Sequence, residues 1–289
     1  MRGYVSPGMN IDFYKMHGAG NDFILVDDRE GRFPWRDRDW VARSAARRTG
    51  VGCDGVALIQ RSDRADFRMR FLNPDGGEAS MCGNGARCIA RLAAELGAAP
   101  ARMRIETEAG LLRAVVDGDS VRVWMTEPRG WSPNRELTWP DGAPVLGHVL
   151  DTGVPHFVTE VPDIEAVDVA GLGARIRRHP AFAPEGANAN FIRIESRDRL
   201  RLRTYERGVE AETLACGTGM VACALAAARL GRVDLPVTVV PASGDRLEVD
   251  ARLDDEAFRE VTLTGPAVHV YRGVLVYAGD GGGTVISDQ

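Results

Sequence analysis

The sequence predicts an α+β fold of two similar domains, and the main observation behind this prediction is an internal repeat. Segments 81–97 and 215–231 align without a gap at an offset of 134 residues, with eight of seventeen positions identical. The identical positions include the cysteine and both glycines of a Cys-Gly-x-Gly pattern, which unrelated alanine-rich helices would not share. The same offset places Phe23-Ile24 on Phe157-Val158. Each half therefore carries the same elements in the same order.

Each half is expected to hold several strands and one strong helix. The strands predicted in the first half are 23–27, 57–60, 67–72, 102–107, 111–116 and 121–125. Those predicted in the second half are 157–160, 191–194, 200–205, 237–240, 247–249 and 260–264. The helices, 84–96 and 218–230, are rich in alanine and leucine and end at Gly97 and Gly231. Because both helices are apolar over most of their circumference, we expect strands to wrap each of them.

The predicted domains are 10–127 together with 266–289, and 128–265. Segment 127–144 contains four prolines and two glycines, which favours a linker between the halves. A further strand pattern covers 268–276, after the second half is complete. We expect this strand to return to the first domain.

Composition and charge exclude several classes of protein. The formal net charge of −5 gives no electrostatic footprint for nucleic acid, and no apolar run reaches the roughly 18–20 residues of a membrane span. Residues 1–10 lack the apolar stretch of a signal peptide, so we expect a cytoplasmic protein. Five cysteines, an odd number, indicate reduced thiols, and their spacing does not match a metal site.

No cofactor is expected either. The sequence lacks Gly-x-Gly-x-x-Gly, a Walker loop and HExxH. Lys15 is the only lysine in the chain, which argues against a pyridoxal phosphate Schiff base. The chemistry must then come from ordinary side chains.

Cys82 and Cys216 are the strongest catalytic candidates. Each immediately precedes a Gly-x-Gly that opens a predicted helix, where free N–H groups and the helix dipole favour an anion. A cysteine in such a position reacts as thiolate. A cysteine inside a helix is more often a small buried hydrophobic residue, and this interpretation suits Cys53, Cys88 and Cys223. For the repeated pair, the shared context favours function.

A reaction that needs two equivalent acid–base groups is the inversion of a stereocentre. One thiolate removes the proton from an α-carbon, while a thiol on the opposite side delivers a proton to the other face. The two groups hold one proton between them, so they titrate as a pair. The natural place for such a shared site is between the two domains.

The chain resembles the diaminopimelate epimerase family from Phe13 to about Gly273. The matching motifs are Lys15-Met-His-Gly-Ala-Gly-Asn-Asp-Phe23, Gly50-Val-Gly-Cys-Asp-Gly55, Phe71-Leu-Asn-Pro-Asp-Gly76, Met81-Cys-Gly-Asn-Gly-Ala-Arg-Cys88, Pro155-His156, Gly186-Ala-Asn188, Tyr205-Glu-Arg-Gly208 and Glu212-Thr-Leu-Ala-Cys-Gly-Thr-Gly219. The resemblance implies interconversion of LL- and meso-2,6-diaminopimelate in lysine biosynthesis, without pyridoxal phosphate. It also implies two pseudo-symmetric α+β domains, each a β-barrel-like sheet around a central helix.

The resemblance further implies roles for individual residues. Cys82 and Cys216 correspond to the two bases, and His156 and Glu206 are expected to tune the thiol pair electrostatically. The residues expected to bind the amino-acid substrate are Asn21, Asn73, Gly83, Asn84, Asn188, Glu206, Arg207, Gly217 and Thr218. Tyr271 matches a position linked to dimer formation, so a homodimer is expected.

Several of these residues also have a purely structural interpretation. Asn21, Asn73 and Asn188 lie near glycine or proline, where turn-forming asparagines are common. The Glu206-Arg207 pair also suits a surface ion pair, and Tyr271 an ordinary strand tyrosine. His17 is expected to support a loop rather than to catalyse.

Two positions depart from the family pattern. Val154 stands where many members have a substrate-binding asparagine, and Gly55 where some have glutamine. Both departures remove side-chain hydrogen bonds to substrate.

Two rival functions remain open. One is another cofactor-independent racemase, acting on proline, hydroxyproline or histidine. In proline racemase relatives the first cysteine usually opens Cys-Gly-His-Gly, whereas Asn84 stands here. The other rival is a non-catalytic amino-acid binding protein, which would need neither thiol.

Overall fold

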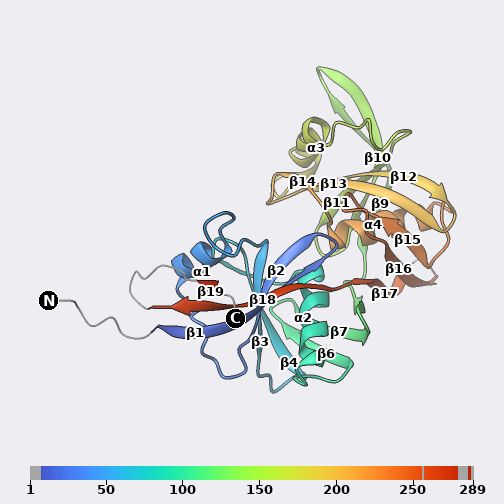
Figure 1. The fold of residues 1–289 in the computed structure, drawn as a ribbon. Coiled ribbons are helices and arrows are strands. Elements are labelled where there is room, and N and C mark those ends of the chain that lie inside the picture. Colours follow the sequence, from blue (N-terminus) through green and yellow to red (C-terminus); the bar gives the residue numbers. More distant parts are fainter. Residues whose placement is uncertain (1–7, 256, 279–285, 288–289) are drawn as a thin grey trace. The chain divides into compact units, whose positions relative to one another are not determined.

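The computed structural model describes residues 8–255, 257–278 and 286–287. The chain divides into two compact units, Met1–Val121 with Pro266–Gln289, and Arg122–Gly265. Both units consist mainly of strands with few helices, so the predicted α+β fold is confirmed (Figure 1). Parts of the N-terminal and C-terminal segments, residues 1–7, 279–285 and 288–289, lie outside the described residues.

The described residues of the first unit form a mixed sheet with two helices. Its elements are β1 (Met9–Gly18), β2 (Asn21–Asp27), α1 (Arg38–Ala45), β3 (Gly55–Gln60), β4 (Phe67–Leu72), β5 (Glu78–Ala79), α2 (Gly83–Glu95), β6 (Arg102–Thr107), β7 (Gly110–Asp117), β8 (Ser120–Trp124, which crosses the unit boundary), β18 (Val268–Tyr277) and β19 (Ile286–Ser287). The strands pair in the order β18-β1-β2-β3-β4-β6-β7. The pairs β2–β3 and β4–β6 are parallel and the others antiparallel. Strand β18 thus returns from the end of the chain to pair with β1.

The second unit repeats this plan. Its elements are β9 (Arg129–Trp139), β10 (Gly142–Asp151), β11 (Pro155–Glu160), α3 (Val169–Arg177), the 3-10 turn Pro180–Phe182, β12 (Asn188–Ser196), β13 (Arg199–Glu206), β14 (Ala211–Thr213), α4 (Gly217–Arg229), β15 (Val237–Val240), β16 (Leu247–Asp254) and β17 (Ala257–Pro266). The pairing order is β9-β10-β11-β12-β13-β15-β16-β17, with β11–β12 and β13–β15 parallel. Phe23 pairs with Gly55, and Phe157 pairs with Ala189, so the register itself repeats at the offset of 134.

Helices α2 and α4 form the centres of their units. Helix α2 packs against β1, β2, β3 and β7, and α4 packs against β10, β11, β12, β13, β15 and β16. Alanine and leucine provide the helix propensity, and nearly every residue from Asn84 to Ala93 is buried. Both helices end at a glycine with positive φ, Gly97 (62°) and Gly231 (68°), which is the residue type this termination favours.

The predicted linker at 127–144 is wrong, because this segment forms strand β9 and the start of β10. The prolines do not interrupt the hairpin, since they lie where the ladder is already irregular. Pro133 and Pro144 fall at shifts of the β9–β10 register, and Pro140 lies in the turn. Proline lacks an N–H group and is tolerated at bulges and turns. Proline content alone is therefore a poor sign of a linker.

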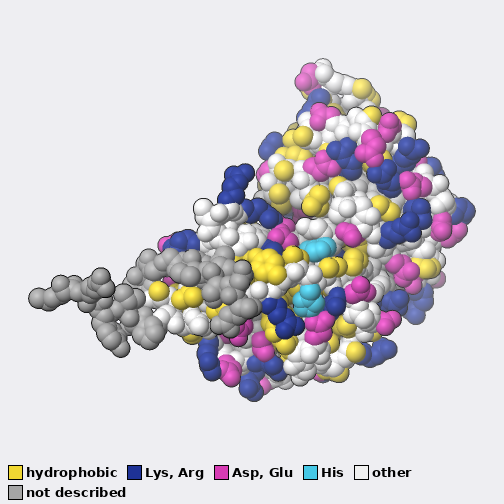
Figure 2. Space-filling model, in the orientation of Figure 1, with side chains coloured by type: hydrophobic (Ala, Val, Ile, Leu, Met, Phe, Trp, Pro, Cys, Tyr) yellow, Lys and Arg dark blue, Asp and Glu magenta, His cyan; other side chains and the backbone are white. Residues whose placement is uncertain are grey.

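The surface shows mixed charge. On the face of the described residues drawn in Figure 2, basic and acidic side chains are interspersed rather than gathered into a patch of one sign. No helix in the described part of the chain has both the length and the apolar character that a bilayer span requires.

Candidate active site

Cys82 lies at the N-terminus of α2, where the sequence predicted it. It is the residue before the first helical position and has an extended backbone (φ −135°, ψ 119°). Its carbonyl accepts the first helical hydrogen bond, from Ala86 N at 2.8 Å. The side chain is partly buried, and its Sγ is 3.7 Å from Asn21 Oδ1. The helix start therefore presents a thiol beside a polar side chain of strand β2.

Asn21 and Asn84 lie together at this thiol. Asn84 Nδ2 donates to Asn21 Oδ1 at 3.1 Å, and Asn84 Oδ1 accepts from Arg87 Nη2 at 3.0 Å. Asn84 and Arg87 are buried (3% and 0% exposed). Two of the predicted substrate-binding residues are thus brought next to Cys82 by the meeting of β2 with α2.

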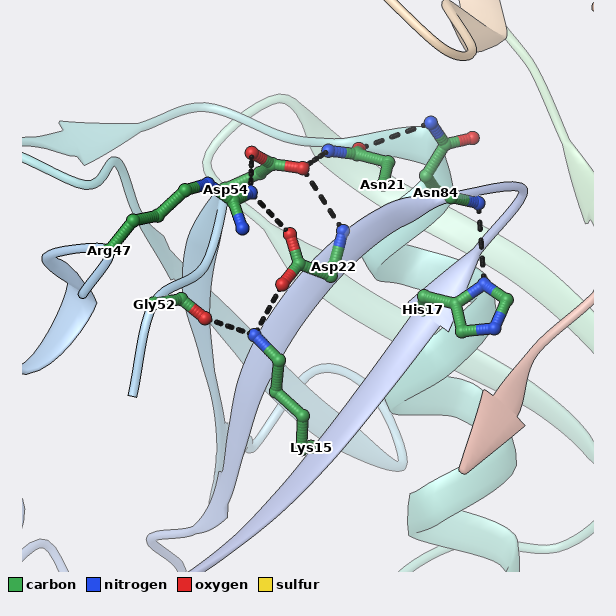
Figure 3. A network of polar contacts seen from close by, with 9 residues as sticks. Lys15, His17, Asn21, Asp22, Arg47, Gly52, Asp54 and Asn84 are labelled. Atoms are coloured by element: carbon green, nitrogen blue, oxygen red, sulfur yellow. Dashed lines mark hydrogen bonds and ion pairs between the residues drawn. The ribbon is translucent and has the colours of Figure 1, made fainter. Parts of the chain in front are cut away.

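A network of charged residues contacts the amide nitrogen of Asn21 (Figure 3). Asp54 Oδ2 accepts from Asn21 Nδ2 at 2.7 Å, and Arg47 Nη2 donates to both Asp54 and Asp22 at 2.7 Å. Lys15 pairs with Asp22 and also donates to a backbone carbonyl. Burial would raise the pKa of Asp22, but the hydrogen bonds from Arg47 and Lys15 outweigh it and hold that pKa below its usual value.

Asn73 does not join this cluster. It is exposed at the end of β4, where its backbone closes a turn through Gly77 O at 2.7 Å and Gly76 N at 2.9 Å. Its side chain makes no hydrogen bond within the described residues. The backbone role matches the turn interpretation, and a substrate contact for Asn73 stays a prediction.

Cys216 holds the matching position in the second unit. It precedes the first residue of α4, with φ −110° and ψ 109°, and is 3% exposed. Its Sγ is 3.5 Å from Thr218 Oγ1. The carbonyl of Thr218 accepts from Thr152 Oγ1 at 2.9 Å, which ties the helix start to the end of β10. Both cysteines therefore share the helix-start geometry, with different polar neighbours.

A neutral polar cluster lies close to Cys216. His156 is fully buried, with Nδ1 3.1 Å from Asn190 Nδ2 and Nε2 3.5 Å from Asn188 Nδ2. Burial lowers the pKa of His156 to about 3; the hydrogen bond with Asn190 acts against this, and the charge of Arg207 adds to it. His156 is therefore neutral near pH 7, so any influence on a thiol comes from an uncharged ring.

Asn190 is a residue that sequence reasoning missed. It is 0% exposed, donates to Phe157 O at 3.1 Å and accepts from Thr204 Oγ1 at 3.0 Å. A β-carbon placed on Gly219 would lie 2.7 Å from Asn190 Oδ1 and 3.3 Å from Cys216 Sγ. The signal was present in Asn188-Ala-Asn190, because alternate residues of a strand share one face.

Asn188, Glu206 and Arg207 are joined through the turn after β13. Asn188 Oδ1 accepts from the Arg207 backbone N at 2.6 Å, and Glu206 Oε2 accepts from Thr213 Oγ1 at 2.8 Å. Glu210, whose φ is 59°, closes the turn through Glu206 O at 2.8 Å. Glu206 and Arg207 are both partly exposed. The structure thus brings three predicted residues together in the second unit.

The remaining cysteines are buried thiols, as the sequence predicted. Cys53 is 3% exposed, and Cys88 and Cys223 are 0% exposed. Burial raises the pKa of Cys53 to about 11 and that of Cys88 to about 12, and it raises the pKa of Cys223 as well. These three thiols are therefore protonated near neutral pH.

Gly55 and Val154, the two departures from the family pattern, differ in their surroundings. At Gly55, an added β-carbon would lie 2.5 Å from the Phe71 ring and 3.1 Å from Leu72 O. Phe71 therefore occupies the space that a longer side chain at position 55 would need. Val154 is partly buried, and its carbonyl accepts from Thr152 N at 3.2 Å.

Two further residues can be placed. His17 Nδ1 accepts from Gly20 N at 3.3 Å, which is the loop-supporting role predicted for it. Tyr271 is 41% exposed on β18, with its ring edge-on to Phe13 at 5.9 Å between centroids. Within the described residues, no group of three or more His, Cys, Asp or Glu side chains is arranged to hold a metal ion.

Because His156 is buried, we expect the stability of the second unit to fall at acid pH. An unfolded histidine takes up a proton near pH 6.5, whereas the folded one does so only near pH 3. Between these values the unfolded state binds more protons, so stability is full above about pH 6.5 and falls with decreasing pH. We expect a loss of about 2 kcal/mol in the free energy of unfolding between about pH 7 and about pH 5.

Urea denaturation at a series of pH values measures this loss. His156→Gln removes the titrating group, so its stability should depend less on pH over the same interval. Equal pH dependence in both proteins would contradict the assignment of a neutral, buried His156.

Solved structures share this architecture. A hydroxyproline epimerase from Agrobacterium vitis aligns with a TM-score of 0.67 at 18% identity, covering 98% of this chain and 96% of that one. A PhzF-family phenazine biosynthesis protein from Bacillus anthracis also reaches 0.67, at 16% identity, covering 92% and 99%. At such low identity these likenesses concern the fold alone. The chain therefore has the two-unit α+β fold of the proline racemase and PhzF class.

Within that class the chain belongs to the diaminopimelate epimerase family, whose model matches residues 13–131 and 148–270. It is 43% identical over 277 residues to the diaminopimelate epimerase of Aquifex aeolicus, covering 92% of this chain and 98% of the relative. It is 41% identical over 280 residues to that of Archaeoglobus fulgidus, covering 92% and 97%. The family resemblance predicted from the motifs is thereby confirmed.

Proposed function

We propose that this chain interconverts LL- and meso-2,6-diaminopimelate as a step of lysine biosynthesis. The observation that carries this proposal is membership of the diaminopimelate epimerase family over nearly the whole length of both this chain and its relatives. Both Cys-Gly-x-Gly helix starts lie inside the matched residues.

In this proposal Cys82 and Cys216 act on opposite faces of one α-carbon. One cysteine, as thiolate, takes the α-proton, and its electron pair remains on the substrate carbon. The other cysteine, as thiol, gives its proton to the opposite face and becomes the thiolate. Atoms and charge balance without an oxidant, reductant or cofactor, and the reverse reaction starts from the exchanged protonation state. The position of each thiol before a helix supports this role.

The polar residues have proposed roles at the two ends of the substrate. The backbone N–H groups of Gly83-Asn84 and Gly217-Thr218 suit the reacting α-carboxylate, because the first turn of a helix leaves its donors free. Arg207 suits the distal carboxylate, which a guanidinium binds bidentately, and Glu206 suits the distal ammonium. Asn21, Asn73 and Asn188 both donate and accept hydrogen bonds, so they complete the contacts to substrate.

A cytoplasmic location and a homodimer are also proposed. A biosynthetic step on a free amino acid favours the cytoplasm. The exposed Tyr271 and its neighbour Val270, 41% and 56% exposed on β18, support a second copy of the chain as the partner of that strand.

Chiral analysis of the products from a panel of amino acids tests the function. With purified protein and no added cofactor, LL-2,6-diaminopimelate should yield the meso isomer, and the meso isomer should yield LL. Proline, hydroxyproline and histidine serve as controls and should keep their configuration. Inversion of one of these three without inversion of diaminopimelate would favour the rival racemase. Binding without inversion of any substrate would favour the non-catalytic alternative.

A further inference from the structure

The orientation of the Asn21 carboxamide is fixed from both sides. Its Nδ2 donates to Asp54 Oδ2 at 2.7 Å, and a carboxylate only accepts hydrogen bonds. The amide oxygen must therefore face away from Asp54, toward Asn84 Nδ2 at 3.1 Å and Cys82 Sγ at 3.7 Å. Asn84 is oriented in turn, because its own oxygen accepts from Arg87 Nη2 at 3.0 Å. If the Asn21 carboxamide were flipped, its Nδ2–H groups would face the Nδ2–H groups of Asn84.

Asp54 itself accepts further hydrogen bonds (Figure 3). Its Oδ2 also accepts from the backbone N of Asp22 at 3.1 Å, and its Oδ1 accepts from Arg47 at 2.7 Å. Arg47 bridges Asp54 to Asp22, and Lys15 holds Asp22 from the other side. These contacts orient the Asp54 carboxylate, and the carboxylate in turn orients the Asn21 amide.

The arrangement is particular to Cys82. The repeat places Asn188 at the position of Asp54 and Pro155 at that of Asn21, so the second unit has no Asn–Asp pair at these positions. One neighbour of Cys216 is Thr218 Oγ1 at 3.5 Å, a hydroxyl that can donate as well as accept. The two thiols, equivalent by repeat, thus lie beside different side chains, the Asn21 amide oxygen and the Thr218 hydroxyl.

From this geometry we propose that Asp54, held by Arg47, is a positioning residue that keeps the Asn21 carboxamide oxygen directed at the Cys82 thiol. An acceptor in that position stabilises the protonated thiol rather than the thiolate. The inference rests on the proposed function, because the protonation of Cys82 matters for turnover only if Cys82 is one of the two bases. It adds a residue, Asp54, that acts through Asn21 without touching the substrate.

Other charged and titratable groups near Cys82 enter the design of the test. The network that contacts the amide nitrogen of Asn21 consists of Lys15, Asp22, Arg47 and Asp54. Helix α2 itself carries Arg87 and Cys88. Removing the Asp54 carboxylate changes the local charge as well as the amide orientation. The test must separate the two effects.

The experiment measures the rate at which iodoacetamide alkylates each cysteine of the substrate-free protein over a range of pH. Peptide mass spectrometry assigns the modified cysteine. In Asp54→Ala, we expect the pH midpoint of Cys82 alkylation to fall by about half a unit, a roughly three-fold larger thiolate fraction below the midpoint. The midpoint of Cys216, measured in the same samples, should stay unchanged.

A double-mutant comparison separates orientation from charge. If Asp54 acts through Asn21, Asp54→Ala should produce no further shift in an Asn21→Ala background. A direct charge effect on Cys82 would survive in that background, and this result would overturn the proposal, as would an unchanged midpoint in the single variant. Asp54→Leu has a similar branched shape and no hydrogen-bond acceptor, and it replaces the alanine variant in the same comparison if that variant does not fold.

A matched control comes from the far end of β2, the strand that carries Asn21. Asp27 pairs with Arg29 at 2.6 Å at that end, so Asp27→Ala also removes a carboxylate from an arginine pair of the first unit. It should leave the Cys82 midpoint unchanged. Because the assay needs no substrate and no turnover, its outcome is independent of whether diaminopimelate is epimerised.

Discussion

Replacing either Cys82 or Cys216 by alanine is expected to reduce the interconversion of LL- and meso-diaminopimelate by about 10²–10⁴-fold. Each direction of the reaction needs one cysteine as base and the other as acid, so loss of either stops inversion in both directions. The structure places each thiol immediately before the first residue of a buried central helix. Steady-state rates measured in both directions check the prediction.

Two other cysteines provide matched controls for these variants. Cys88 and Cys223 lie inside the same helices, one in each unit, and are fully buried. Cys88→Ala and Cys223→Ala remove a thiol from the same helix, so they should lower stability slightly and leave turnover within a few-fold of wild type. Normal turnover in Cys82→Ala or in Cys216→Ala would refute the two-base assignment.

The second large effect is expected at Gly219, the third residue of α4. An added β-carbon would lie 2.7 Å from Asn190 Oδ1, and Asn190 cannot easily move because Phe157 O and Thr204 Oγ1 hold it. The β-carbon would also lie 3.3 Å from Cys216 Sγ. Gly219→Ala should therefore displace the thiol and reduce kcat on the order of 10²-fold, as small misplacements of reacting groups do.

Gly85 is the repeat-equivalent control for Gly219. It is the third residue of α2, so both substitutions share the gain of about 1 kcal/mol in helix propensity. At Gly85 the nearest atoms belong to the side chains of Phe71, Met69 and Phe23 at 3.3–3.5 Å, and these can give way by the small amount required. Gly85→Ala should keep kcat within a few-fold of wild type. Similar losses of kcat in the two variants would show that the crowding at Gly219 is not what matters.

Much of the fold could be predicted from the repeat. The Cys-Gly-x-Gly pattern and the glycine stops located α2 and α4 to within one residue at each end, because these helices begin and end with strong local signals. Helices α1 and α3 were not predicted, although Asp37 and Asp168 cap them by accepting from Trp40 N and Gly171 N. Both helices are short, eight and nine residues, and isolated helices of this length are marginal in water, so the sequence signal for each is weak and the capping aspartate is part of it.

The candidate site was only partly predictable. Cys82, Asn21 and Asn84 lie together as expected, since motifs fix residues near a helix start. The charges of Lys15, Arg47 and Asp54 meet only because β2 and β3 pair in parallel, and such pairing depends on contacts distant in sequence. Asn190 was missed for a similar reason, because its partners His156 and Thr204 come from two other strands.

Deuterium incorporation during the first turnovers in heavy water tests two-base inversion most directly. LL-diaminopimelate of natural isotopic composition should give meso product with one deuterium at the inverted α-carbon, because the incoming proton comes from a thiol equilibrated with solvent. The unreacted LL substrate should still carry protium at both α-carbons. Product that retains protium at the inverted carbon, or substrate that gains deuterium before it inverts, would show that a single group both removes and returns the proton.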